Sequence, residues 1–359
     1  MDNEVLSLIE AWDGEAIVTR FDRPTGTWIF IALHDSTLGP MAGGTRIKVY
    51  PALADGLRDA MRLAEGMTDK WAGLGLGFGG GKAVLALAEP LAGERRRGLL
   101  QRYGAMIQSL RGAFVTGADL GTSTEDMATI AGACQHVLGI DYDDMTSTDP
   151  GPFTAFGVLC GLKAAVAHAY GSGDLAGRRI LVQGLGGVGD PLARSLARDG
   201  ASLLLSDLDA QRATDLAAEL DAAGLDAEVI DSESVYSASC DVYAPCAIGA
   251  TINAQTIPQL ACRVVAGSAN NQLLEPEDAE RLHRKGVLYA PDYIINAGGA
   301  MAFSLMKDGE RAEETLMRQV ATIGDAVGEI LGEASASEVS PLAAAKQRVR
   351  RILRDGLAR

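Results

Sequence analysis

The chain has 359 residues and a formal charge of −15, from 47 acidic and 32 basic residues. This acidic excess repels nucleic acids, whose binding needs clustered Lys and Arg side chains, so no nucleic-acid partner is expected. Hydrophobic residues make up 47% and charged residues 22% of the chain, which excludes a largely disordered protein, and the length predicts about two domains.

The first residues, MDNEVLSLIEAWDGE, are acidic and lack the basic and apolar regions of a signal peptide. No apolar run approaches the roughly 18–20 residues of a membrane span, so no membrane association is expected. The five cysteines form no C-x-x-C pair and the four histidines have no ligand spacing, which disfavours disulfides and bound metal ions. A reduced, cytoplasmic, metal-free protein is expected.

A first glycine cluster, GLGLGFGGGKAVL, contains the G-x-G-x-x-G pattern of dinucleotide-binding loops at Gly75, Gly77 and Gly80. That function requires a strand before the glycines and a helix after them. Here the apolar spacing of residues 53–67 predicts a helix before the cluster, and AVLALAEP at 83–90 predicts a strand after it. The cluster is therefore predicted to be a glycine-rich loop that does not hold phosphates.

The same segment is not a P-loop, because Leu76 and Ala83 stand where that motif needs Gly and Ser or Thr. Six glycines lie between Lys70 and Lys82, and glycines let a backbone approach a ligand closely and adopt positive φ angles. The two amines are candidates for an anion-binding group and for a base whose pKa is lowered by burial. Lysines are also ordinary solvated surface residues, and the spacing alone leaves both interpretations open.

A second cluster, GLGGVG, has the strand–helix–strand context that a dinucleotide-binding loop requires. RILVQ at 179–183 predicts a buried parallel strand before it. The apolar spacing of VGDPLARSLARDG predicts a helix that ends near Gly200, with Pro191 in its first turn, where proline is tolerated. ASLLLSD then predicts a second strand that ends at Asp207.

The residues of this second cluster have separate expected roles. Gly184 permits a tight turn, Gly186 lets backbone N–H groups approach a pyrophosphate, and Gly189 lets helix and strand pack closely. Asp207 would accept hydrogen bonds from the adenosine ribose hydroxyls and repel a 2′-phosphate, so NAD is expected rather than NADP. An ordinary glycine turn would explain the glycines but not Asp207 in register with them.

Near the C-terminus, QRVRRILRDGLAR carries Arg348, Arg351 and Arg354 at helical spacing. Three basic side chains on one helix face are typical of a solvated surface. We therefore expect a terminal helix with an exposed basic face, not a nucleic-acid site.

Several longer blocks follow one another along the chain: HDSTLGPMAGGTR (34–46), EGMTDKWAGLGLGFGGGKAV (65–84), VTGADLGT (115–122), GPFTAFGV (151–158), the strand–helix–strand unit above, APCAIGATIN (244–253), AGSANNQL (266–273) and APDYIINAGG (290–299). From about residue 25 to residue 300, their order resembles that of the leucine, phenylalanine and valine dehydrogenases, which are relatives of glutamate dehydrogenase. The resemblance implies an oxidative deamination, in which an L-amino acid, NAD and water give a 2-oxo acid, ammonium and NADH.

The resemblance implies a role for both lysines. Lys70 matches the lysine of the family's G-M-T/S-x-K segment and would bind the substrate carboxylate. Lys82 matches the lysine of G-G-G-K and would be the catalytic amine, which deprotonates a water that attacks the imine carbon. A dry, closed cleft beside other cations would lower its pKa enough for this. Asp119, in the block resembling T-x-x-D-V-G-T, would carry protons to and from the departing nitrogen and hold Lys82 in place.

The resemblance also assigns residues around the two ligands. Thr154 would steady the nicotinamide carboxamide, and Asn271 would share the substrate carboxylate and border the cofactor. Gly43 and Gly44 would line the pocket with backbone. The other residues assigned by the match are Met67 at the substrate, and Gly187, Val188 and Ala247 at the cofactor.

The implied fold is α/β, with two domains and a cleft between them. Residues 1–150 would form an N-terminal α/β domain for substrate binding and oligomerisation, and residues 151–332 a Rossmann-type, doubly wound NAD-binding domain. The last helix, at 333–359, would pack back on the first domain. Closure of the cleft would bring the nicotinamide against the substrate Cα. Members of the family are homo-oligomers, so a homo-oligomer is expected.

The expected substrate is an apolar L-amino acid, branched-chain or aromatic, or in reverse its 2-oxo acid. Glutamate-specific relatives carry a lysine before the Gly-Gly pair, whereas this chain has Ala42, and a buried carboxylate without a partner is costly. Alignment also places Gly117, Ala300 and Phe303 in the pocket wall. All but Phe303 are smaller than their leucine-type counterparts, which favours a bulky or aromatic substrate, whereas Phe303 either fills that room or stacks on a ring.

Two positions depart from the family pattern. Ala250 stands where a glycine is usual, and the Asp-Glu-Leu that follows NAGG in the family is absent, which leaves the far wall of the pocket undefined. The alternatives are a non-catalytic NAD-binding regulator, a glutamate-type dehydrogenase and a hydroxy-acid dehydrogenase. The last would need a histidine with a carboxylate partner, and no histidine lies in a candidate catalytic block.

Overall fold

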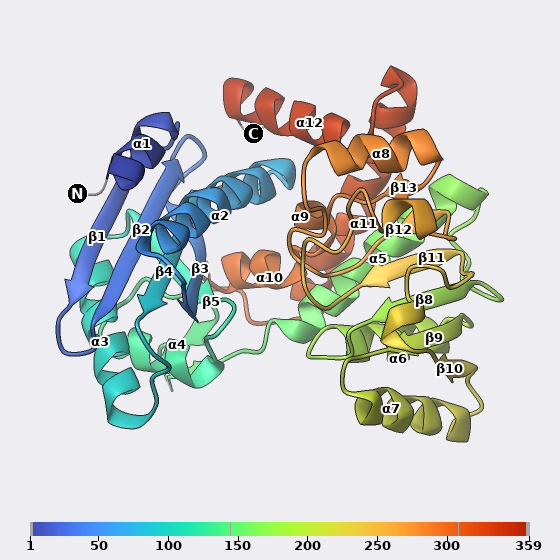
Figure 1. Ribbon diagram of the computed structural model, residues 1–359, viewed down its shortest axis with the longest axis horizontal. Coiled ribbons are helices and arrows are strands. Elements are labelled where there is room, and N and C mark those ends of the chain that lie inside the picture. The colour runs from blue at the N-terminus through green and yellow to red at the C-terminus, as the bar shows by residue number, and fades with distance from the viewer. Residues whose placement is uncertain (1–2, 144, 308, 357–359) are drawn as a thin grey trace. The chain divides into compact units, whose positions relative to one another are not determined.

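The computed structural model describes residues 3–143, 145–307 and 309–356 and consists of two compact units (Figure 1). Unit 1 contains the chain up to Asp149 and again from Val349, and unit 2 contains Pro150–Arg348. Each unit is built on its own β-sheet. The two-domain α/β fold expected from the sequence is confirmed.

The sheet of unit 1 has five strands in the order β1-β2-β4-β3-β5. β2 pairs antiparallel with β1 and β4, whereas β3 pairs parallel with β4 and β5. The strands are β1 (Ala16–Asp22), β2 (Thr27–Asp35), β3 (Met41–Val49), β4 (Gly79–Leu87) and β5 (Phe114–Ala118). A separate two-stranded ribbon consists of β6 (Ile140–Asp141) and β7 (Thr146–Ser147).

Helices cover both faces of this sheet. Because successive strand residues point to opposite faces, Val84 and Ala86 of β4 pack under α2, while Ala83 and Leu85 pack toward α3 and α4. The helices of unit 1 are α1 (Asn3–Ala11), α2 (Leu53–Gly73), α3 (Gly93–Ser109) and α4 (Thr124–Ala131). The face under α2 is the one that carries the charged residues described below.

The structure corrects the expected glycine-rich loop between α2 and β4. α2 continues to Gly73, beyond its predicted end at residue 67, and β4 begins at Gly79, so the loop spans residues 74–78 only. A Cβ at Gly80 would lie 1.9 Å from Thr68 Oγ1 of α2, closer than any real contact. The glycines of β4 are therefore needed because helix and strand pack closely. Of the six glycines, which are all described, Gly75 is the one with a positive φ.

The sheet of unit 2 is parallel throughout, in the order β10-β9-β8-β11-β12-β13. Numbered from β8, this is the 3-2-1-4-5-6 order of a dinucleotide-binding Rossmann fold. The strands are β8 (Arg179–Gln183), β9 (Ser202–Ser206), β10 (Ala227–Val229), β11 (Val242–Pro245), β12 (Val264–Val265) and β13 (Leu288–Tyr289).

The remaining helices are α5 (Gly151–Tyr170), α6 (Gly189–Arg198), α7 (Ala210–Ala222), α8 (Glu277–Lys285), α9 (Asp292–Ile295), α10 (Gly298–Lys307), α11 (Glu313–Ser337) and α12 (Pro341–Asp355), with 3₁₀ turns at Ser232–Ser234 and Ile257–Gln259. The predicted strand–helix–strand unit corresponds to β8, α6 and β9. Pro191 lies in the first turn of α6, and Gly200 follows the helix with a φ of 85°, as expected for a glycine that ends a helix.

One expectation about apolar segments was wrong. α5 has 20 residues and a mean hydropathy of 1.3 in its most apolar window, so by length and composition alone it could cross a membrane. Half of that window is buried inside the protein. Core helices of this kind pass the same test, because buried helices are apolar on most sides.

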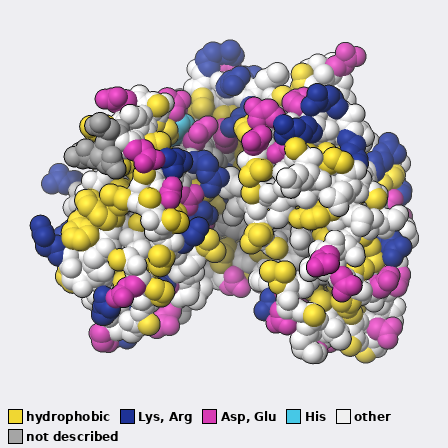
Figure 2. Space-filling view, viewed as in Figure 1, with side chains coloured by type: hydrophobic (Ala, Val, Ile, Leu, Met, Phe, Trp, Pro, Cys, Tyr) yellow, Lys and Arg dark blue, Asp and Glu magenta, His cyan; other side chains and the backbone are white. Residues whose placement is uncertain are grey.

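The C-terminal helix also differs from its prediction. α11 runs to Ser337 and α12 begins only at Pro341, so the last helix starts later than residue 333. Arg351 and Arg354 lie on an exposed face, as predicted, but Arg348 has 18% of its side chain exposed and pairs with Glu329 at 2.6 Å. On the face of the molecule drawn in Figure 2, Lys and Arg side chains are interspersed with Asp and Glu.

Candidate active site

Lys82 lies in the interior of β4, and 4% of the residue is exposed. Its side chain projects from the same face of the sheet as Val84, toward α2. The Lys82 Nζ is 2.9 Å from Asp119 Oδ1. Lys82 is therefore placed by the sheet and not by a glycine-rich loop as expected.

Asp119 follows the last residue of β5 and is fixed by a local turn. Its backbone N–H donates to Thr122 Oγ1 at 2.8 Å, and the Thr122 N–H donates back to the Asp119 carbonyl at 3.0 Å. A Cβ at Gly44 would lie 2.7 Å from both the Ala118 carbonyl oxygen and the Asp119 Cβ. Gly44 is therefore required for Asp119 to lie beside β3.

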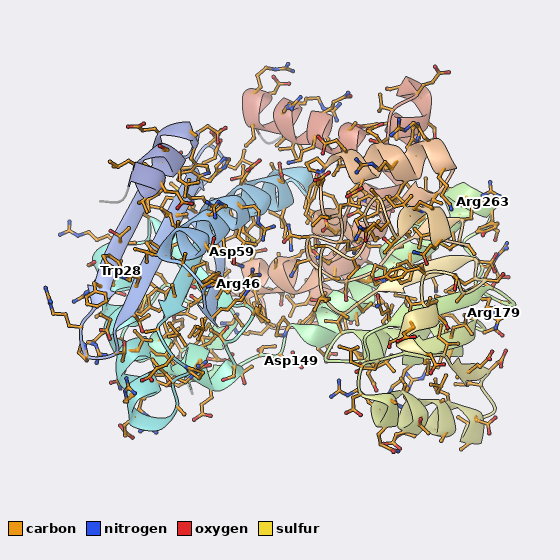
Figure 3. The ribbon with its side chains drawn as sticks, in the orientation of Figure 1. Trp28, Arg46, Asp59, Asp149, Arg179 and Arg263 are labelled. Carbon is orange, nitrogen blue, oxygen red and sulfur yellow. The ribbon has the colours of Figure 1, made fainter. Side chains whose placement is uncertain are left out.

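Three further residues complete a charged network that the sequence did not predict. Arg46 Nε donates to Asp119 Oδ2 at 2.8 Å, and Arg46 Nη1 donates to Asp59 Oδ2 at 3.0 Å. The Tyr50 hydroxyl donates to the same Asp59 oxygen at 2.6 Å. Figure 3 shows Arg46 and Asp59 next to each other between β3 and α2. One sequence feature could have indicated this network. Arg46 lies two residues after Gly44, and residues two apart in a strand lie on the same face of the sheet.

Burial and neighbouring charges set the protonation of the pair. Desolvation lowers the pKa of the Lys82 amine, and Arg46 lowers it further, against the opposing effect of Asp119. Desolvation alone would raise the pKa of Asp119, but the Lys82 and Arg46 cations outweigh it and hold that pKa well below its ordinary value. The site thus keeps a carboxylate ionised beside an amine that loses its proton more readily than a free lysine.

The other predicted residues of unit 1 lie around the same face. Gly43 is next to Gly44 in β3, and a Cβ at Gly43 would come within 3.0 Å of Met67 Cγ on α2. Lys70 lies in the last turn of α2 and is partly buried. Gly117 is the register partner of Gly44. The structure therefore brings Gly43, Gly44, Met67, Gly117, Lys82 and Asp119 together within unit 1.

Ala42 is fully buried, and its carbonyl oxygen accepts a hydrogen bond of 2.8 Å from Trp71 Nε1. Trp71 also packs against Phe78 at 5.1 Å between ring centroids. Glutamate-specific relatives would carry a cation at the position of Ala42. In this chain the side chain at that position is apolar.

In unit 2, the second glycine cluster has the geometry expected of each residue. Gly184 has a φ of 90°, which gives the tight turn, and a Cβ at Gly189 would lie 1.8 Å from the Gly184 carbonyl oxygen. A Cβ at Gly186 or Gly187 would meet no atom within 4 Å. Close packing thus explains Gly189, while Gly186 and Gly187 border open space before α6 that suits a pyrophosphate.

Asp207 lies at the carboxyl end of β9 and is held in place by backbone groups. Its Oδ2 accepts the Leu185 N–H at 2.7 Å and its Oδ1 accepts the Asp209 N–H at 2.9 Å. Arg212 Nη1 lies 3.5 Å from Oδ2. Burial would raise the pKa of this carboxyl, but the two hydrogen bonds and Arg212 lower it, so Asp207 is a fixed anion.

Thr154 lies in the first turn of α5 and ties it to α10. Its Oγ1 donates to the Pro150 carbonyl at 2.9 Å and accepts the Gly299 N–H at 3.2 Å. Ala247 follows β11 and closes the Gly184 turn, since a Cβ on Gly184 would lie 2.7 Å from the Ala247 Cβ. Val188 is the residue immediately before α6.

Asn271 has a φ of 52°, which is uncommon for a non-glycine residue. Its carbonyl accepts the N–H of Ala250 at 2.7 Å, and Ala250 itself has a φ of 61°. This positive φ explains why glycine is usual at position 250. On α10, Phe303 is 6% exposed and Ala300 is partly buried.

Comparison with known proteins decides the family. A model described as Glu/Leu/Phe/Val dehydrogenase, dimerisation domain, matches residues 24–136, and one described as Glutamate/Leucine/Phenylalanine/Valine dehydrogenase matches residues 203–346. The leucine dehydrogenase of Geobacillus stearothermophilus is 38% identical over 342 residues, which are 95% of this chain and 91% of that protein. The chain belongs to the Glu/Leu/Phe/Val dehydrogenase family.

This dehydrogenase is also 38% identical over 340 residues to the phenylalanine dehydrogenase of Bacillus thermotolerans, covering 94% of this chain and 88% of the relative. Its fold is similar to the crystal structure of L-tryptophan dehydrogenase from Nostoc punctiforme, with a TM-score of 0.81, 35% identity and 98% of both chains covered. It is an amino-acid dehydrogenase, an oxidoreductase that acts on a CH–NH2 group with NAD or NADP. The regulator and hydroxy-acid alternatives find no support.

Proposed function

We propose that this dehydrogenase catalyses the reversible, NAD-dependent oxidative deamination of an apolar L-amino acid to its 2-oxo acid and ammonium. The observation that carries the proposal is the Lys82–Asp119 pair, 2.9 Å apart and buried in unit 1. This chemistry needs an amine that can be neutral and, beside it, a carboxylate that is ionised at the start and can accept a proton. The pKa directions of both groups support that assignment.

In the proposed reaction, NAD supplies the acceptor for the hydride that leaves the substrate Cα. Neutral Lys82 takes a proton from the water that attacks the resulting imine carbon. Asp119 holds Lys82 through its Oδ1 and carries protons to and from the substrate nitrogen. Lys70 binds the substrate carboxylate. The reaction balances when the amino acid, NAD⁺ and water give the 2-oxo acid, ammonium, NADH and one proton.

The proposed cofactor is NAD, because Asp207 presents a fixed anion where a 2′-phosphate would lie. Replacing Asp207 with alanine removes the acceptor for the ribose hydroxyls and leaves Arg212 without this carboxylate. We expect kcat/KM for NAD to fall by about 10- to 100-fold, since a hydrogen bond to a charged group contributes about 1.5–3 kcal/mol. We also expect the preference for NAD over NADP to narrow.

Steady-state kinetics with both cofactors checks this, and Asp215→Ala, an exposed carboxylate on α7, is the matched control. A variant at Asp207 that keeps the wild-type NAD:NADP ratio would contradict the assignment of NAD to this carboxylate.

The proposed substrate has a bulky apolar side chain. The relatives named above are leucine, phenylalanine and tryptophan dehydrogenases. The buried, apolar Ala42 supports this choice over glutamate, since a substrate side-chain carboxylate would be buried without a cation.

Gly117 offers a direct test of side-chain size. Among the described residues, a Cβ there would meet Leu138 Cβ at 3.6 Å, an ordinary van der Waals distance, so the fold tolerates alanine. We expect Gly117→Ala to lower kcat/KM for phenylalanine relative to leucine by about 10-fold, the scale of one methyl group in an apolar pocket. Competing initial-rate assays measure the ratio. Gly328→Ala in α11, where a Cβ would lie more than 4 Å from the described residues beyond the neighbouring backbone of its own helix, is the control, and an unchanged ratio would remove Gly117 from the pocket.

We further propose that the enzyme is a homo-oligomer that acts in the cytoplasm. The match of residues 24–136 to a dimerisation domain supports the first point. Five free thiols are compatible with the second, since a reducing compartment keeps cysteines unpaired.

The test of the proposed function is an assay of NADH formation at alkaline pH with NAD and separate L-amino acids. Leucine, valine, phenylalanine and tryptophan should be oxidised at rates that differ among them, while glutamate should be a poor substrate. Oxidation of glutamate alone, or of no amino acid while NAD binds, would reject the proposal.

A further inference from the structure

Arg46 is a buried cation that the proposed reaction does not use, although it contacts a residue that the reaction needs. Its side chain is 13% exposed and bridges two carboxylates, Asp119 at 2.8 Å and Asp59 at 3.0 Å. The two carboxylates are 12% and 14% exposed. A guanidinium with two separate N–H groups suits such a bridge, because its planar fork fixes both partners at once.

The network connects α2 to the reacting pair. Asp59 belongs to α2. Its Oδ2, which accepts Arg46, also accepts the Tyr50 hydroxyl at 2.6 Å, and its Oδ1 accepts Arg62 Nη2 at 2.9 Å. Asp119 follows β5, so without Arg46 its Oδ2 would lose this partner while its Oδ1 faces Lys82. The carboxylate therefore has one oxygen for the amine and one for the anchored arginine.

Resting on the proposed function, we propose that Arg46, anchored on α2 by Asp59, is the positioning residue that fixes the Asp119 carboxylate against the Lys82 amine. Arg46 acts through Asp119 and takes no part in the chemistry itself. Asp59 acts one contact further away by holding the guanidinium, and Tyr50 in turn holds Asp59. The rotamer of Asp119 is thereby set by a rigid helix and not by its own turn alone.

The charges of the network make the proposal testable through the pH dependence. The Arg46 cation lowers the pKa of Lys82, whereas the Asp59 anion raises it. Removing Arg46 should therefore raise that pKa, so that neutral Lys82 and the acid limb of the kcat profile appear at higher pH. Removing the Asp59 charge should lower that pKa and move the acid limb to lower pH. The Asp119 and Arg62 charges, which also belong to this network, are the same in every variant.

The experiment measures kcat against pH for the full-length enzyme and for Arg46→Gln, Arg46→Lys and Asp59→Asn, with the best amino-acid substrate and NAD. We expect shifts of about 0.5 pH unit or more, in opposite directions for Arg46→Gln and Asp59→Asn. We also expect kcat to fall by about 10-fold or more in Arg46→Gln, because a misplaced carboxylate loses the alignment of the reacting groups. Arg46→Lys keeps the positive charge, so its acid limb should lie at the same pH as in the wild-type enzyme. Its kcat should remain below the wild-type value.

Arg58→Gln is the matched control, since Arg58 lies on α2 one residue from Asp59, is 47% exposed and pairs only with exposed carboxylates. It should change neither kcat nor the profile. A purely structural role would predict loss of thermal stability and rate without opposite shifts, and that result, or shifts of the same sign, would overturn the proposal. If Arg46→Gln does not fold, the test is a shift of the acid limb to lower pH in Asp59→Asn together with a lowered kcat and an unshifted acid limb in Arg46→Lys, and the absence of either result would overturn the proposal. A wild-type enzyme without amino-acid oxidation would instead reject the proposed function.

Discussion

Lys82→Ala is expected to lower kcat by about 10³-fold or more, because a positioned general base contributes about 10²–10⁴-fold and no other amine occupies its place. The loss should not come from unfolding. Lys82 lies at 4% exposure in a strand, and alanine leaves the salt bridge of Asp119 with Arg46 intact. Binding of NADH should be unchanged, since Gly184, Gly186 and Asp207 belong to unit 2.

Single-turnover kinetics and NADH fluorescence titration together check this expectation. Lys163→Ala, which removes a half-exposed lysine paired with Asp199 on the surface of unit 2, is the control. A Lys82→Ala enzyme with more than about a tenth of the wild-type kcat would show that another group acts as the base.

Asp119→Asn is the second change with a large expected effect. The amide keeps the shape but can no longer exchange protons with the substrate nitrogen, so kcat should fall by about 10²–10⁴-fold. The negative charge of Asp119 raises the pKa of Lys82, and its loss leaves desolvation and Arg46, both of which lower that pKa. The residual activity should therefore have its acid limb at lower pH than the wild-type enzyme.

The measurement is the pH profile of kcat for the wild-type enzyme and for Asp119→Asn. The slow variant is assayed at high enzyme concentration. Asp55→Asn, an exposed carboxylate on α2 that pairs with Arg58, is the control and should leave the profile unchanged. An acid limb that moves to higher pH in Asp119→Asn would contradict the assigned electrostatics.

The Rossmann half of the fold could be predicted from local pattern alone. An apolar strand, a glycine turn with a helix start, and a second strand ending in an acid lie within 30 residues, and each signal is local. The structure places β8, α6 and β9 where this pattern predicts them. Gly184 and Gly189 also have the turn and the close packing that their spacing implies.

The first glycine cluster could not be interpreted from local pattern, because its glycines are required by tertiary packing. Gly80 is needed for the approach of α2 to β4 at Thr68, a contact that no local spacing encodes. The same limit applies to the charged network. Arg46 and Asp59 lie on different elements, and Asp119 follows a third. The register of β3 and β5 places Arg46 beside Asp119, and the packing of α2 on the sheet adds Asp59. The proposed catalytic pair, Lys82 and Asp119, was predicted from family resemblance and not from spacing.

The measurement that tests the central claim most directly is the product balance of a single reaction. Purified enzyme, NAD and one apolar L-amino acid should yield NADH, ammonium and the 2-oxo acid in equal amounts, and Lys82→Ala should form all three about 10³-fold more slowly or slower still. NADH formed without ammonium, or ammonium released by the Lys82→Ala enzyme at the wild-type rate, would contradict the account.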